Sequence, residues 1–109
     1  MPETIKLIMA ELKEALEKTY GDKLKKLVLF GSHARGDARP DSDIDFLVVL
    51  DFSEKDLSVS REIMKINETA VDLILKYEKT ISIIPVSFET YMESQYSFFI
   101  NVRKEGIAA

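Results

Sequence analysis

The sequence contains no cysteine and a single histidine, His33, among its 109 residues. The absence of cysteine excludes disulfide bonds and thiolate metal sites, and one histidine cannot build a zinc site. No apolar run reaches the ~18 residues that a membrane-spanning helix needs, and the N-terminal Met1-Pro2-Glu3 does not begin a signal-peptide pattern. We therefore expect no membrane association, and a cytoplasmic location fits by default.

Basic residues are also fewer than acidic ones, with 15 Lys and Arg against 19 Asp and Glu and a net charge of −4. This balance argues against an extended nucleic-acid surface. The 46% apolar and 31% charged residues are typical of a globular protein. A chain of this length can bury one core but has little room for a second module, so we expect residues 1–109 to form a single domain.

The most informative stretch is Leu29–Leu50, which reads LFGSHARGDARPDSDIDFLVVL. Its second half contains Asp43 and Asp45 directly before the apolar run Phe46–Leu50, which predicts a strand opening with two carboxylates. Residues i and i+2 of a strand project to the same side, so these carboxylates are expected to lie close together. Two adjacent like charges destabilise a strand unless a cation is held between them, and carboxylate oxygens suit Mg²⁺ or Mn²⁺.

The first half of this stretch predicts a strand, Leu27–Phe30, that ends at a small-residue turn. Gly31 allows close approach of a ligand to the backbone, and Ser32 is a candidate cap for a short helix beginning at His33. Exposed amides at a helix start favour phosphate. If the two strands pair, the phosphate cradle and the carboxylates lie at neighbouring strand ends, as a nucleoside triphosphate with its metal requires.

The pattern Phe30-Gly31-Ser32-x-Ala34-Arg35-Gly36, with Ser42-Asp43-x-Asp45 following, resembles the signature of the polymerase-β-type nucleotidyltransferases. It is most similar to their minimal branch, the MNT domains that pair with HEPN toxins. The resemblance implies catalytic, metal-binding roles for Asp43 and Asp45, nucleotide-binding roles for Gly31, Ser32 and Arg35, ATP as substrate and Mg²⁺ or Mn²⁺ as cofactor. The motif is specific for the superfamily and says little about the acceptor.

The resemblance also implies a partner. MNT antitoxins silence a HEPN ribonuclease toxin by transferring AMP to one of its tyrosines, so our first hypothesis is a protein adenylyltransferase antitoxin in a hetero-oligomer with a HEPN-type toxin. The alternative is a catalytically weak nucleotide-binding antitoxin that neutralises its partner by masking it. Transfer to a small molecule is a third reading, and it needs an acceptor pocket for which the chain is short.

One feature departs from the wider family. Enzymes of this superfamily commonly carry a third carboxylate on a later strand, but the predicted strand Thr80–Ser87 has none. The nearest carboxylate is Glu89, which we interpret as a first-turn helix residue behind a Ser87 cap. In two-metal phosphoryl transfer the third carboxylate helps hold the ion that activates the attacking hydroxyl. Its absence favours the masking alternative.

Three further polar residues have competing interpretations. Arg35 is a candidate for phosphate contact, but bracing of the loop through Asp37 or Asp41 is favoured. His33 is expected to be an exposed helix residue rather than a general base. Arg39 lies in a polar loop and is expected to face solvent.

Periodicity completes the architecture. Apolar residues at three-to-four spacing predict helices over Glu3–Thr19 and, with Ser53 as cap, over 54–77. Pro85 places the third strand at an edge or at its end. The aromatic tail predicts two short helices broken at Ser94-Gln95, and its patch Tyr96–Ile100 is a candidate partner surface as well as core covering. The expected fold is α/β (α+β): a nucleotidyltransferase-type core with a small mixed sheet of three or four strands and flanking helices.

Overall fold

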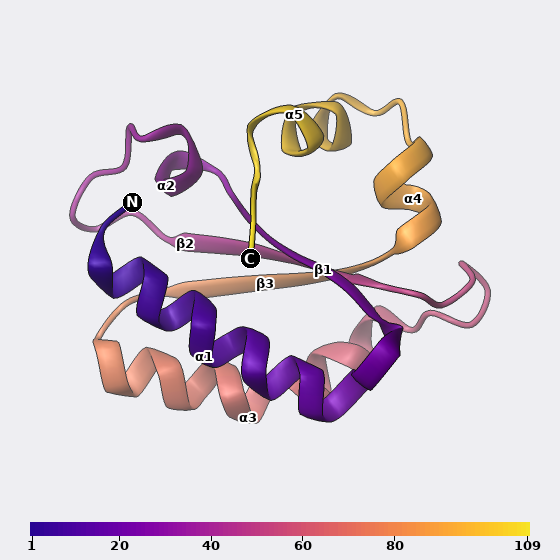
Figure 1. The fold of residues 1–109 in the computed structure, drawn as a ribbon, viewed down its shortest axis with the longest axis horizontal. Helices are drawn as coiled ribbons and strands as arrows, with labels where there is room; N and C mark the ends of the chain where they lie inside the picture. The colour runs from indigo at the N-terminus through magenta and orange to yellow at the C-terminus, as the bar shows by residue number, and fades with distance from the viewer.

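The computed structural model describes residues 1–109 as a four-stranded mixed sheet with helices on both faces, which confirms the predicted fold (Figure 1). The strand order is β3-β2-β1-β4, with β2 and β3 parallel and the other pairs antiparallel. The elements in chain order are α1 (Glu3–Tyr20), η1 (Gly21–Lys23), β1 (Leu24–Phe30), α2 (Ser32–Arg35), β2 (Ile44–Leu50), α3 (Val59–Tyr77), β3 (Ile81–Ser87), α4 (Phe88–Glu93), α5 (Ser97–Glu105) and β4 (Ile107–Ala108).

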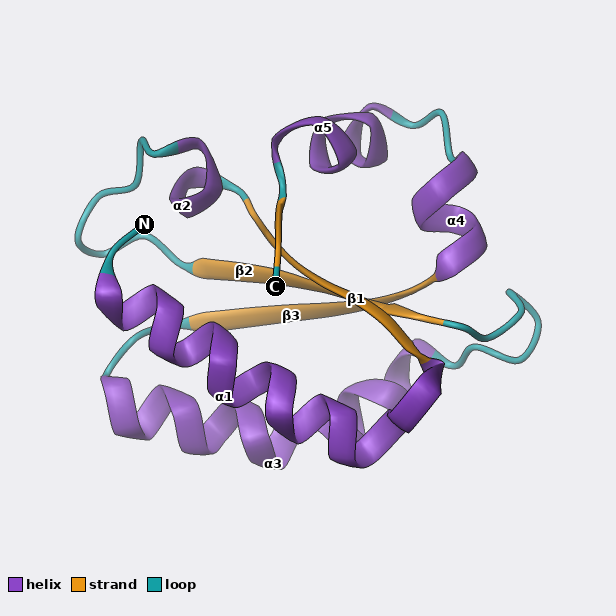
Figure 2. Cartoon of the chain, in the orientation of Figure 1, coloured by secondary structure: helices purple, strands orange, loops and turns teal.

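The central strand β2 separates two apolar clusters, because its side chains alternate between the faces of the sheet. Phe46 and Val48 pack with α1 and α3 in a cluster of 15 buried residues. Leu47 and Val49 face the other way and pack with Tyr91 of α4 and residues of α5. Figure 2 shows α1 and α3 on one side of the sheet and α2, α4 and α5 on the other. Asp45 belongs to the second face by the same alternation.

The first predicted strand of the central stretch starts earlier than its apolar run suggests. Strand β1 begins at Leu24, which pairs with Leu50, whereas the predicted strand began at Leu27. The sequence did not indicate this start, because Lys25 and Lys26 break the alternation of polar and apolar residues. Their exposed ammonium groups lie over the rings of Phe88 and Tyr91. Cross-strand packing therefore outweighs local composition here.

The second strand begins at Ile44, so Asp45 lies inside β2 while Asp43 lies just before it. The prediction of a strand that opens with both carboxylates is therefore correct for Asp45 only.

The predicted start of the long helix is wrong by five residues. Helix α3 begins at Val59, and its cap is Ser58, whose side chain accepts from the Arg61 amide. Ser53 instead closes a separate turn, its carbonyl accepting from the amides of Asp56 and Leu57. Glu54 in this turn accepts hydrogen bonds from the hydroxyls of Ser87 and Thr90, which hold the segment against the end of β3. Those distant contacts keep it out of the helix.

Two predictions about the second half of the chain are confirmed. β3 is an edge strand, and Pro85 lies within it. The tail forms two helices separated at Ser94-Gln95. The short strand β4 was not predicted; it pairs with β1 at Val28 and Leu29. None of the helices combines the length and apolarity that crossing a bilayer requires.

Candidate active site

The turn after β1 and the start of β2 lie against each other because the two strands are antiparallel and Phe30 pairs with Asp45. Gly31 follows with φ +77°, a conformation that residues with a Cβ rarely adopt. A Cβ at Gly31 would lie 2.6 Å from Oδ2 of Asp45. The glycine is therefore required twice, for the turn and for the space that the carboxylate fills. The two halves of the sequence motif meet as predicted.

Ser32 does not cap the short helix that follows. Gly31 occupies the cap position, Ser32 is the first residue of α2, and no side-chain cap bond is present. The Gly31 carbonyl accepts from the amides of Ala34 and Arg35 at 3.1 Å. The Ser32 hydroxyl makes no hydrogen bond within the protein and remains available to a ligand.

Arg35 is held by two carboxylates. Its Nε donates to Oδ2 of Asp37 at 3.2 Å, and its Nη1 lies 3.8 Å from Oε2 of Glu105 in α5. The first partner is one of the two that the sequence suggested, and the second, 70 positions away along the chain, was not expected. These bonds give Arg35 a bracing role, and its half-exposed guanidinium keeps donors free for a phosphate.

His33 is neither free nor fully exposed. It is half-buried, and its Nε2 lies 3.2 Å from the carbonyl oxygen of Ser42. Ser42 also accepts, through Oγ, a 2.8 Å bond from the amide of Arg39. The loop that Figure 2 shows between α2 and β2 is therefore tied at the residue directly before Asp43. Arg39 itself faces solvent, as predicted.

The two aspartates differ in environment. Asp43 is exposed and Asp45 is half-buried at the start of β2. Burial, and then the negative charge of Asp43, raise the pKa of Asp45, while His33 and Arg35 oppose this rise. The two carboxylates therefore repel each other when both are ionised. A cation between the two carboxylates would remove both costs.

The donor set fits a hard divalent cation in part. Two carboxylates provide oxygen ligands of the kind that Mg²⁺ and Mn²⁺ prefer, and Mg²⁺ usually takes its remaining ligands from water and substrate phosphates. No group of three or more carboxylate or histidine side chains is arranged so that it could hold a metal ion. Ser82 is the β3 residue paired with Asp45, where a third carboxylate would have completed the set.

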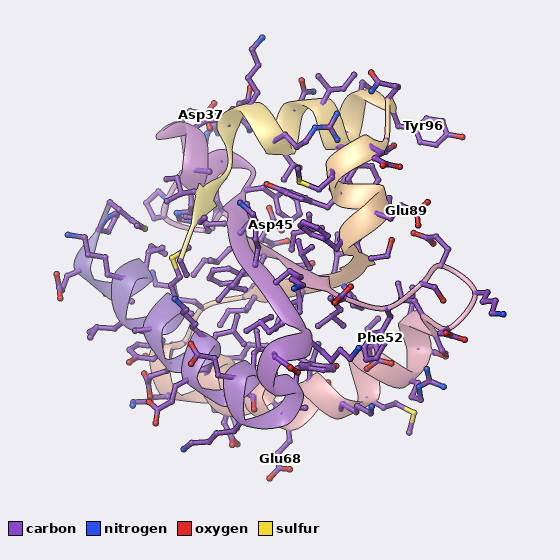
Figure 3. The ribbon with its side chains drawn as sticks, turned by 45° about the vertical axis from the view of Figure 1, so that its right-hand side comes forward. Asp37, Asp45, Phe52, Glu68, Glu89 and Tyr96 are labelled. Carbon is purple, nitrogen blue, oxygen red and sulfur yellow. The ribbon has the colours of Figure 1, made fainter.

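Glu89 does not replace the third carboxylate. Ser87 caps α4 by accepting from the Thr90 amide at 3.1 Å, and Glu89 lies in the first turn of that helix, as predicted. It follows the end of β3 that pairs with Leu50, whereas Asp45 lies at the opposite end of β2. Figure 3 shows Asp45 and Glu89 well apart. The site therefore has two carboxylates.

A cleft of about 320 Å³ opens beside Gly31, and α5 forms its far wall. Its lining includes Phe98, Asn101 and Glu105, which sequence reasoning did not connect with the site. Their three-to-four spacing placed them on one helix face, but only the fold shows what that face meets. Phe98 packs edge-to-face on Phe30, so part of the predicted apolar patch Tyr96–Ile100 covers the site.

A family model described as "Nucleotidyltransferase domain" matches residues 9–105 of the chain. Two Methanocaldococcus jannaschii proteins, each named "Putative protein adenylyltransferase", align over most of the chain. One is 36% identical over 97 residues, covering 88% of each chain. The other is 33% identical over 100 residues, covering 92% of this chain and 93% of its own.

Solved structures share the fold at lower identity. A Sulfolobus solfataricus structure titled "putative nucleotidyltransferase" superposes with a TM-score of 0.63 at 19% identity, covering 97% of this chain and 82% of its own. A crystal structure of a toxin–antitoxin with AMP-PNP gives a TM-score of 0.60 at 18% identity, covering 92% of this chain and 70% of the other.

Proposed function

The chain belongs to the nucleotidyltransferase domain family, and we propose that it transfers AMP from ATP to the hydroxyl of a tyrosine in a HEPN-type toxin. In this way it acts as the antitoxin of that toxin. The observation that carries this proposal is the packing of Gly31 against Asp45, with Asp43 close by. It joins a turn suited to phosphate with a carboxylate pair suited to the accompanying cation.

In the proposed reaction the tyrosine oxygen forms a bond to the α-phosphorus of ATP, the bond to the bridging oxygen breaks, and pyrophosphate leaves. Asp43 and Asp45 would hold Mg²⁺, or Mn²⁺, whose charge stabilises the phosphate oxygens when it is bound. Gly31 lets the chain approach the phosphates, and the free hydroxyl of Ser32 donates to them. Arg35 adds positive charge at the same turn, and the tyrosine proton passes to solvent.

The comparisons support protein as the acceptor. Both Methanocaldococcus jannaschii relatives are named for adenylyl transfer to protein. The fold is shared with a toxin–antitoxin bound to AMP-PNP.

Masking without chemistry is the second candidate, and one observation favours it. Ser82 stands beside Asp45 where a third carboxylate would help activate the attacking hydroxyl. In the masking alternative the site binds nucleotide, and complex formation alone silences the toxin.

Intact-mass spectrometry of the HEPN partner separates the two candidates. After incubation with this chain, ATP and Mg²⁺, adenylyl transfer adds one or more AMP units to the partner. The double variant Asp43→Asn/Asp45→Asn should abolish the gain, while Asp41→Asn, an exposed carboxylate in the same loop, should preserve it. A stable complex with no change in mass would rule out transfer to the toxin and leave masking.

A further inference from the structure

One face of α5 borders the cleft beside Gly31. Phe98, Asn101 and Glu105 follow each other at intervals of three and four residues, which places them on one side of the helix. All three line the cleft beside Gly31. Figure 1 shows α5 and α2 on the same side of the sheet, with the C-terminal strand between them. The face therefore looks across the cleft toward the site.

The cleft adjoins Asp45 at Gly31. This residue lines the cleft and also lies against Oδ2 of Asp45. A nucleotide whose phosphates lie at the Gly31 turn and Asp45 would have its remaining part directed to a neighbouring hollow. The volume of about 320 Å³ is within the range of small-ligand pockets, which begins at about 300 Å³.

The charges in the cleft favour the nucleoside over the phosphates. Glu105 contributes a negative charge that repels phosphate inside the cleft, and its ion pair with Arg35, at 3.8 Å, offsets that charge in part. A neutral nucleoside meets no such repulsion. Its ribose hydroxyls are donors that a carboxylate accepts, as acidic residues do in dinucleotide sites.

The remaining groups match a purine base. Phe98 is 41% exposed although its ring packs against those of Phe30 and Phe99, with centroids 5.4 and 5.0 Å away. It is thus a braced aromatic with surface left for a base to stack on. Asn101 is exposed and makes no side-chain hydrogen bond, so its amide can both donate and accept. That pattern complements the N6 and N7 edge of adenine, whereas the O6 and N7 edge of guanine needs two donors.

We propose that the cleft between β1, α2 and α5 is the nucleoside subsite, in which Phe98 stacks on the base, Asn101 selects adenine and Glu105 binds the ribose. This inference rests on the proposed function for the position of the phosphates and for ATP as substrate, and adds the residues that bind its nucleoside. A tyrosine side chain of the acceptor is the competing occupant. It is disfavoured because a lone phenol would leave Asn101 and Glu105 largely unmatched.

Isothermal titration with AMP-PNP, GMP-PNP and inorganic tripolyphosphate, each with Mg²⁺, tests the proposal. Phe98→Ala should weaken AMP-PNP binding about ten-fold, as loss of a stacked base typically does. Asn101→Ala should lower the preference for AMP-PNP over GMP-PNP by a similar factor. Tripolyphosphate binding should not change in either variant. Tyr96→Ala is the matched control, since this tail aromatic is 79% exposed and lies outside the cleft.

Asn101→Ala alters an exposed residue and keeps the test valid if Phe98→Ala unfolds, which thermal melts would reveal. The proposal is overturned if Asn101→Ala and a folded Phe98→Ala both keep the AMP-PNP affinity and the base preference of the wild type. If such variants bind nucleotide normally but lose transfer, the cleft holds the acceptor instead. Phe98-dependent AMP-PNP binding without any transfer would support the subsite while refuting the proposed function. If the wild type transfers AMP but the variants bind nucleotide with unchanged affinity, the proposed function is supported and the subsite is refuted.

Discussion

The imidazole Nε2 of His33 lies 3.2 Å from the carbonyl oxygen of Ser42, the residue that directly precedes Asp43. Since a carbonyl only accepts, the ring donates through Nε2–H. The contact fixes the end of the loop between α2 and β2 from outside the loop itself. Asp43 is exposed and lies just outside the strand, so its position depends on this tie on one side and on the strand that begins at Ile44 on the other.

Replacing His33 should therefore raise the metal requirement of the reaction. We expect His33→Ala to increase the Mg²⁺ concentration for half-maximal AMP transfer about five-fold, the effect of one hydrogen bond worth ~1 kcal/mol. His33→Gln, whose amide can donate over a similar reach, should recover most of the loss. Initial rates measured against Mg²⁺ at saturating ATP provide the check. Arg39→Ala in the same loop should match the wild type, and an unaltered requirement in His33→Ala would contradict the positioning role.

Gly31→Ala should abolish transfer while Gly36→Ala should not. Both glycines have positive φ, +77° and +84°, so each alanine costs ~1 kcal/mol in backbone strain. Only at position 31 does the new methyl group meet another atom, Oδ2 of Asp45 at 2.6 Å, whereas nothing lies within 4 Å at position 36. Thermal unfolding and transfer rates of both variants test this. Equal loss of activity in the two would show that strain, and not displacement of Asp45, is responsible.

Asp45 should make the metal-free protein less stable as the pH rises. Burial and the charge of Asp43 raise its folded-state pKa above the unfolded value, so ionisation is costlier in the native state. The cost is absent in acid and fully present above the folded pKa. In EDTA at pH 7, Asp45→Asn should raise Tm by a few degrees, and the gain should vanish near pH 3. If Asp45→Asn does not raise Tm at pH 7, the ionised Asp45 does not destabilise the native state. Added Mg²⁺ should raise the Tm of the wild type only.

Glu62 should show the opposite pH dependence. It is fully buried and accepts from the Tyr20 hydroxyl at 2.9 Å and from Arg61 Nε at 3.1 Å, with Lys65 Nζ 3.5 Å away. Burial alone would raise the pKa of Glu62, but these donors and charges together hold it below its usual value. Its contribution to stability is present above the unfolded pKa of about 4.3 and is lost as the pH falls through the folded value.

We expect Glu62→Gln to lower the free energy of unfolding by ~1–3 kcal/mol at pH 7, because a charge that three donors surround is removed. The difference from the wild type should shrink in acid, and chemical denaturation at pH 7 and pH 3 measures it. Glu68→Gln on the same helix is the control, since Glu68 is exposed and makes no ion pair. If the difference in the free energy of unfolding is the same at both pH values, the variant acts through the shape of the side chain and not through its charge.

The sequence predicted those parts of the fold that local patterns encode. The apolar run Phe46–Leu50 and the stripe of the long helix fixed their element types, and Pro85 indicated an edge strand. Boundaries that depend on distant contacts were missed. Glu54 stays outside α3 because it bonds to Ser87 and Thr90, 33 and 36 positions away. A two-residue strand such as β4 is too short to show any period.

The same division holds for the site. Gly31, Asp43 and Asp45 were predicted as site residues from their types and spacing, and strand pairing places the Gly31 turn against Asp45. The contact of His33 with Ser42 was missed because a bond to a backbone carbonyl leaves no mark on composition. The wall formed by α5 was missed for a similar reason, since the contact between residues 35 and 105 depends on the complete sheet.

The edge position of Pro85 bears on how the protein behaves at high concentration. The Ile44 amide donates to the Thr80 carbonyl, so alternation turns the amide positions of Ile81, Ile83 and Pro85 outward, away from β2. Proline has no amide hydrogen to offer there. A strand from another molecule could pair beside the isoleucines but would lose the ladder at Pro85. The one long open edge of the sheet is thereby protected against the edge-to-edge growth that leads to aggregates.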